Sequence, residues 1–161
     1  MSIRAAILTI SDSAVAGTRE DRSGPALAAK AAELGWTVAA KQVLPDEVDQ
    51  ISATLQSLAD SDTVELILTT GGTGLAARDI TPEAIRGLMR VELPGFGEVM
   101  RAESMKITPN AILSRNLAAV VEQSLVVALP GKPSGAVECL GFVTGAIPHG
   151  VALVQRMPTS C

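Results

Sequence analysis

The stretch Val64-Glu65-Leu66-Ile67-Leu68-Thr69-Thr70-Gly71-Gly72-Thr73-Gly74 decides the fold class of this 161-residue chain. Residues 64–69 are mostly aliphatic or β-branched, which favours a strand, and the glycines end the run abruptly. Thr81-Pro82-Glu83 then supplies a helix cap and a proline where the missing N–H costs nothing. The stretch therefore predicts a buried strand, a Gly-rich loop and a helix, in that order.

The N-terminal half shows the same alternation. Residues 5–10 form a nearly continuous apolar run, as expected of a strand covered on both faces of a parallel sheet. Ser23-Gly24-Pro25 carries the signal of an N-cap and first helical turn, and this helix should end at Gly35. Residues 36–44 predict a second strand, and Pro45-Asp46 opens a helix with apolar residues at helical spacing.

The C-terminal half predicts a mainly helical segment over 94–116, a hairpin of strands 118–121 and 125–129, and helices interrupted near Pro148. Strands that alternate with helices imply right-handed βαβ units. We therefore expect one domain over residues 1–161, a three-layer α/β/α sandwich with a mostly parallel central sheet and a small hairpin. In such sheets ligands bind at the carboxyl ends of the strands, where the Gly-rich and Asp-bearing loops of this chain fall.

Composition argues against several functions. The formal net charge is −4, no basic stripe occurs, and Trp36, Phe96 and Phe142 are the only aromatic residues. Binding to nucleic acid or to anionic lipid is therefore not expected, because both need clustered cations and nucleic-acid platforms also need stacking rings.

The metal-binding residues are equally few. Cys139, Cys161 and the single histidine, His149, make no zinc spacing, no disulfide framework and no histidine-based triad. A metal, if used, would be Mg²⁺ on oxygen ligands. No leader peptide and no apolar run of membrane-span length is evident, so we expect a cytoplasmic protein.

The loop Gly71-Gly72-Thr73-Gly74 is the strongest local signal. Glycines let a backbone approach phosphate oxygens and point N–H donors at them, although a plain tight turn is the alternative. The loop is neither a P-loop, since no Gly-Lys-Ser/Thr follows, nor the dinucleotide fingerprint.

Four charged residues have both a structural and a functional interpretation. Asp79 either pairs with Arg78 and favours a helix start or faces the phosphate site as a Mg²⁺ ligand. Asp46 either caps a helix or acts in catalysis. Lys132 and Arg115 lie in loops from which a cation could reach a phosphate, and are otherwise solvated.

Eight motifs occur together in one order along the chain. The chain resembles the molybdopterin adenylyltransferases, which include the bacterial Mog proteins, the gephyrin G domain and a plant cofactor-synthesis domain. The motifs are Ile10-Ser11-Asp12-Ser13, Asp21-Arg22-Ser23-Gly24-Pro25, Pro45-Asp46-Glu47, Thr70-Gly71-Gly72-Thr73-Gly74, Arg78-Asp79-Ile80-Thr81-Pro82-Glu83-Ala84, Pro94-Gly95-Phe96-Gly97-Glu98, Ile112-Leu113-Ser114-Arg115 and Leu129-Pro130-Gly131-Lys132-Pro133.

The resemblance implies adenylyl transfer from ATP to the terminal phosphate of molybdopterin, with Mg²⁺, in a homotrimer. It assigns the family's two acidic positions to Asp46 and Asp79, as residues that act in catalysis and hold the metal. It places the nucleotide at residues 71–74, and it leaves open a partner protein that inserts molybdate. The loops that contain Ser114, Arg115, Pro130, Gly131 and Lys132 are the candidates for holding the pterin.

Three other functions compete with this one. A non-catalytic molybdopterin carrier or scaffold of the same fold is the nearest alternative, and a nucleotide pyrophosphatase is the second. A flavodoxin-like or Rossmann-like redox protein is the third, but the fingerprint is missing and few aromatic rings could stack on a flavin.

Overall fold

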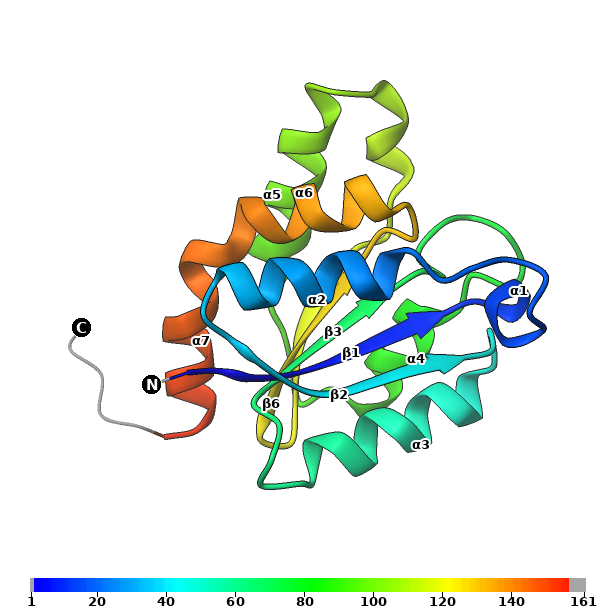
Figure 1. The fold of residues 1–161 in the computed structure, drawn as a ribbon. Coiled ribbons are helices and arrows are strands. Elements are labelled where there is room, and N and C mark those ends of the chain that lie inside the picture. Colours follow the sequence, from blue (N-terminus) through cyan, green and yellow to red (C-terminus); the bar gives the residue numbers. More distant parts are fainter. Residues whose placement is uncertain (1, 157–161) are drawn as a thin grey trace.

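A computed structural model describes residues 2–156 and shows one six-stranded sheet between two layers of helices (Figure 1). The strand order is β2-β1-β3-β6-β5-β4. The strands are β1 (Arg4–Ile10), β2 (Thr37–Leu44), β3 (Leu66–Thr70), β4 (Val91–Glu92), β5 (Ala118–Val121) and β6 (Ser124–Leu129). Cys161 and the ends of the predicted domain, residues 1 and 157–161, lie outside the described residues.

The sheet is mixed, as predicted. Strands β2, β1, β3 and β6 are parallel neighbours, while β5 runs antiparallel to β6 and forms the predicted hairpin. The edge strand β4 pairs antiparallel with β5 and was not predicted. Two residues are too few to show a period of two, so only pairing with β5 defines this strand.

The helices are α1 (Asp12–Val15), α2 (Ser23–Glu33), α3 (Val48–Ala59), α4 (Thr81–Leu88), α5 (Pro94–Met105), α6 (Pro133–Val143) and α7 (Ile147–Val154), with 3₁₀ turns η1 (Pro109–Leu113) and η2 (Thr144–Ala146). The break before Pro148 was predicted. Two predicted caps were wrong, because Arg22 precedes α2 and Ile80 precedes α4. The Ser23 hydroxyl instead donates to the Gly131 carbonyl at 2.5 Å, and the Thr81 hydroxyl donates to the Gly71 carbonyl at 2.9 Å.

Each face of the sheet has its own hydrophobic core. Leu66 and Leu68 of β3 face α2, α5, α6 and α7, while Ile67 between them faces α3 and α4. Strand β1 therefore continues into a helix on one face, and β3 into a helix on the other (Figure 1). Connections that leave in opposite directions open a crevice between the two strand ends, which is where parallel sheets bind ligands.

The α6–α7 run, Pro133–Val154, departs from one expectation. Its 22 residues include a window of mean hydropathy 1.5, so by length and composition it could cross a membrane. The prediction that no apolar run reaches that length was wrong. The run is interrupted by η2, and its buried residues, including Leu140, Ile147 and Val151, belong to the core beneath α2 and α5.

Leu68→Ala should destabilise the protein by about 2–5 kcal/mol, because this fully buried side chain sits in the central strand and its removal leaves a cavity. Leu153→Ala is the matched control, since Leu153 is 53% exposed, and it should change stability by less than about 0.5 kcal/mol. Urea unfolding of both variants measures the difference. Equal effects would contradict the assigned core.

Candidate functional site

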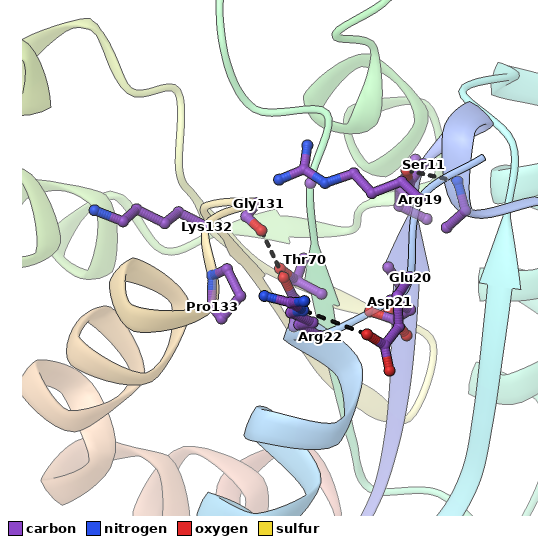
Figure 2. Close-up of a pocket in the computed structure, with 14 residues that line it drawn as sticks. Ser11, Arg19, Glu20, Asp21, Arg22, Thr70, Gly131, Lys132 and Pro133 are labelled. Atoms are coloured by element: carbon purple, nitrogen blue, oxygen red, sulfur yellow. Dashed lines mark hydrogen bonds and ion pairs between the residues drawn. The ribbon is translucent and has the colours of Figure 1, made fainter. Parts of the chain in front are cut away.

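A cavity of about 710 Å³ lies over the crevice between β1 and β3 (Figure 2). Thr9 of β1 and Thr70 of β3 are register partners, so the two strands end side by side beneath it. We call this space the crevice cavity. Its wall comes from these strand ends, from the β1–α2 connection and from the β6–α6 loop, and it is lined by Thr9, Ile10, Ser11, Ala14, Arg19, Glu20, Asp21, Arg22, Ser23, Thr70, Gly71, Gly131, Lys132 and Pro133.

Three cations line this cavity: Arg19, Arg22 and Lys132. Figure 2 shows Arg19 extending toward the Gly131 loop, whereas Lys132 extends away from it. Only Lys132 was a sequence candidate. Arg22 belongs to one of the eight motifs but was given no role, and Arg19 lies in a polar connection outside them. Two carboxylates, Glu20 and Asp21, line the same cavity, and Arg22 pairs with Glu20 at 3.4 Å. The three cations outnumber them, which suits an anionic ligand.

The Gly-rich loop has the backbone that only glycine adopts freely. Gly71 has φ +100° and Gly72 has φ +67°, and a Cβ on Gly71 would clash with the Ile10 carbonyl oxygen. The Gly71 N–H donates to the Leu129 carbonyl at 3.2 Å. Within residues 2–156, the N–H groups of Gly72, Thr73 and Gly74 have no protein acceptor, so they remain available as donors.

The Asp46 side chain ties the end of β2 to the start of α1 and does not cap α3. Its Oδ2 accepts the Asp12 N–H at 3.0 Å, and Asp12 Oδ1 accepts the Asp46 N–H at 2.9 Å. Helix α3 begins beyond it, with Glu47 at the cap position. Burial raises the pKa of the Asp46 carboxyl, the Asp12 N–H opposes this, and the negative charges of Asp12 and Asp79 add to it.

Asp79 lies at the far end of the Gly-rich loop. Its Oδ2 accepts the Ala76 N–H at 2.8 Å and would lie 2.7 Å from a Cβ on Gly74. A Cβ on Gly72 would lie 3.4 Å from Asp46 Oδ1. Both carboxylates therefore approach the loop backbone, and neither lines the crevice cavity.

Asp46 and Asp79 each offer a carboxylate oxygen, the type of ligand that Mg²⁺ prefers. Over residues 2–156, Oδ1 of Asp46 and Oδ1 of Asp79 accept no hydrogen bond from the protein, and no group of three or more His, Cys, Asp and Glu residues gathers to hold a metal. Mg²⁺ commonly binds one or two carboxylates together with waters and substrate phosphates.

Arg115 braces the Gly-rich loop. Its backbone N–H donates to the Thr73 carbonyl at 2.9 Å, and its Nε donates to the Gly74 carbonyl at 2.8 Å. The remaining guanidinium nitrogens contact the Asp79 carbonyl and the Glu83 carboxylate. The ion pair with Arg115 lowers the pKa of Glu83. Direct contact between Arg115 and a substrate stays a prediction.

Ser114, Pro130 and Lys132 meet at a second cavity of about 290 Å³, between α5, η1 and α6. Lys132 lines both this cavity and the crevice cavity. Cys139 is part of the wall, and burial raises the pKa of its thiol. Pro130 and Gly131 also border a shallower hollow beside Thr73 and Gly74. The loops predicted to hold the pterin therefore lie next to one side of the Gly-rich loop.

The Gly-rich loop follows β3, at the point where neighbouring parallel strands continue to opposite faces of the sheet. Cations lie near one side of the loop and the carboxylates of Asp46 and Asp79 near the other. These features define an α/β domain with a candidate phosphate site. Residues 6–149 match the family described as "Probable molybdopterin binding domain", and the chain belongs to this family.

Two bacterial molybdopterin adenylyltransferases are similar to this chain along most of their length. A molybdopterin adenylyltransferase of Helicobacter pylori strain J99 is 43% identical over 155 residues, which cover 95% of this chain and 88% of that protein. The Escherichia coli K12 protein of the same name is 38% identical, over 93% of this chain and 80% of its own. The crystal structure of the molybdopterin biosynthesis enzyme MoaB from Thermus thermophilus superposes with a TM-score of 0.90 at 43% identity, covering 98% of this chain and 99% of the other.

Gly71→Ala should destabilise the protein by roughly 2–6 kcal/mol, because the new methyl group meets a backbone carbonyl that cannot move and the positive φ becomes strained. Gly141→Ala is the control, since this α6 glycine has open space around it and should gain about 0.5–1 kcal/mol. Thermal unfolding compares them. A Gly71→Ala protein as stable as the parent would show that the loop does not need glycine there.

Proposed function

We propose that this protein transfers the adenylyl group of ATP onto the terminal phosphate of molybdopterin and releases pyrophosphate. The observation that carries the proposal is the pair of cavities that share Lys132. The first has Arg19, Arg22 and Gly71 in its wall, and the second has a more apolar wall. Two relatives that cover most of this chain carry the name of that activity.

The reaction joins two polyanions, so repulsion and misalignment are the main obstacles. A terminal phosphate oxygen of molybdopterin bonds to the α-phosphorus of ATP, and the bond from that phosphorus to the bridging oxygen of pyrophosphate breaks. Such transfers depend mainly on positioning and electrostatic stabilisation. The attacking phosphate is already ionised at neutral pH, so the site needs no general base.

Each part of the site has a role in this scheme. The free N–H groups of residues 72–74 and the cations Arg19 and Arg22 hold the nucleotide phosphates. Asp46 and Asp79 would hold Mg²⁺, since each has a carboxylate oxygen that accepts no protein hydrogen bond, and neither needs to transfer a proton. A Mg²⁺ ion held there would offset negative charge on the α-phosphate and on the leaving pyrophosphate.

Molybdopterin binds on the other side of Lys132. The second cavity has Met100 and Cys139 in its wall, and Ser114 and Lys132 at its edge, so it offers an apolar surface for the ring system and polar groups for the phosphate. Arg115 contributes here by bracing the loop that separates the two reactants.

Three further expectations accompany the proposal. We propose a homotrimer, a cytoplasmic location and, as a later step, transfer of the product to a molybdate-inserting partner. Light scattering tests the first of these directly, and a monomer at micromolar concentration would contradict it.

Incubation with ATP, Mg²⁺ and molybdopterin, followed by mass spectrometry, tests the activity. We expect adenylylated molybdopterin and pyrophosphate in equal amounts, and no nucleotide loss when molybdopterin is left out. Nucleotide loss without molybdopterin would indicate a pyrophosphatase. Binding of molybdopterin without pyrophosphate release would indicate a carrier.

Asp79→Asn should lower the rate of adenylyl transfer about 10²-fold or more and leave the fold unchanged, because an amide cannot replace the negative charge that holds the metal. Asp49→Asn is the matched control, since Asp49 is exposed on α3 and lies outside the site. Single-turnover kinetics on both variants measure the effect. An Asp79→Asn protein with the parent rate would remove Asp79 from the mechanism.

A further inference from the structure

A set of hydrogen bonds joins three segments that follow strand ends, and it involves Asp12, Asp46 and Arg78. Asp12 and Asp46 exchange two hydrogen bonds, each between one residue's backbone N–H and the other's carboxylate, at 3.0 and 2.9 Å. Arg78 donates from Nε to Asp12 Oδ2 and from Nη2 to the Asp46 carbonyl, the latter at 3.2 Å. Asp12 follows β1, Asp46 follows β2, and Arg78 immediately precedes Asp79.

Within this arrangement, one carboxylate oxygen of Asp46 accepts a hydrogen bond and the other accepts none from the protein, so the second oxygen is available to a ligand. Oδ2 is held by the Asp12 N–H, which fixes the orientation of the carboxylate and leaves Oδ1 beside Gly72. Groups that hold a metal ligand by hydrogen bonding set its orientation in the same way. The backbone N–H of Asp12 thus determines which oxygen of Asp46 faces the Gly-rich loop, while the Asp12 carboxylate holds the Asp46 main chain and Arg78 in place.

Arg78 connects this unit to the second carboxylate. Because Arg78 and Asp79 are adjacent, bonds from the Arg78 guanidinium to Asp12 and to the Asp46 carbonyl fix the segment that carries Asp79 relative to Asp46. The Asp12 and Arg78 side chains are 42% and 62% exposed, and such pairs contribute little to stability. A positioning role accounts for the three-way geometry better than a stabilising one.

We propose that Asp12 and Arg78 are positioning residues, which set the orientation of Asp46 and its distance from Asp79 and touch neither substrate. This inference rests on the proposed function. It adds two residues that act only through the acidic pair. Arg78 also neutralises Asp12, so that Asp12 can lie against Asp46 without adding an uncompensated negative charge to the metal site.

Two variants of Asp12 separate positioning from folding. Asp12→Asn keeps an oxygen that can accept the Asp46 N–H but loses the charge that Arg78 binds, whereas Asp12→Ala loses both. We expect kcat for adenylyl transfer to fall about 10–100-fold in Asp12→Ala and less in Asp12→Asn. The KM for ATP should change less than about threefold, because contact with the nucleotide is not lost. Arg78→Lys should resemble Asp12→Asn, since lysine has no fork to span two acceptors.

A second measurement does not depend on turnover. Mn²⁺ bound in the presence of a non-hydrolysable ATP analogue can be titrated by electron paramagnetic resonance, and its affinity should fall about 10–100-fold in Asp12→Ala. Asp49→Asn, on the exposed side of α3, should match the parent in both measurements. If the parent protein binds Mn²⁺ with the analogue but transfers no adenylyl group, the proposed function fails and the Mn²⁺ titration alone decides the positioning role.

Several results would overturn the proposal. Parent-like Mn²⁺ affinity in both Asp12→Ala and Arg78→Lys would show that neither residue positions the pair. A rise in the KM for ATP with unchanged kcat in Arg78→Lys would show that Arg78 touches the nucleotide. If Asp12→Ala does not fold, Asp12→Asn and Arg78→Lys carry the test with the same expected directions.

Discussion

The site depends on the contact between the Gly71 backbone and the Ile10 carbonyl, where no side chain fits. This contact lets the ends of β1 and β3 lie side by side although their chains leave toward opposite faces of the sheet. The crevice above them, the free N–H groups of the next three residues and the approach of both carboxylates all follow from that close packing. A single methyl group at Gly71 would separate the strand ends on which these features rest.

The Gly-rich loop lies between the crevice cavity and the side chains of Asp46 and Asp79, which do not line that cavity. The cavity wall holds three cations and two carboxylates, those of Glu20 and Asp21, and Arg22 pairs with Glu20 at 3.4 Å. A polyanion in the cavity is therefore held by a mixed set of charges in which cations are in excess. The Gly-rich loop contributes only main-chain dipoles, which carry no net charge and need no counter-ion.

Much of the fold could be predicted because each β–α unit carries its own local signals. The parallel strands, the hairpin and the break before Pro148 were all evident from apolar runs and breakers. The predicted caps at Ser23 and Thr81 were wrong, because their hydroxyls bond to carbonyls of Gly131 and Gly71 that are close only in space. Arg19, Arg22 and the bracing role of Arg115 escaped prediction for the same reason: each depends on loops from distant parts of the chain. The acidic pair was assigned through resemblance, and the structure adds which oxygen of each carboxylate is free.

Gly131 contacts two other segments at the crevice, because the Ser23 hydroxyl at the start of α2 donates to its carbonyl and a Cβ on Gly131 would lie 3.3 Å from the Cα of Gly71. Fluctuations that open one of these segments must disturb the other two. The backbone amides at the rim of the crevice cavity and at the entrance to the second cavity would then undergo hydrogen exchange together, as one cooperative unit. A ligand that orders either cavity would lower the entropy cost of ordering the other, so the two reactants can favour each other's binding without any change of shape.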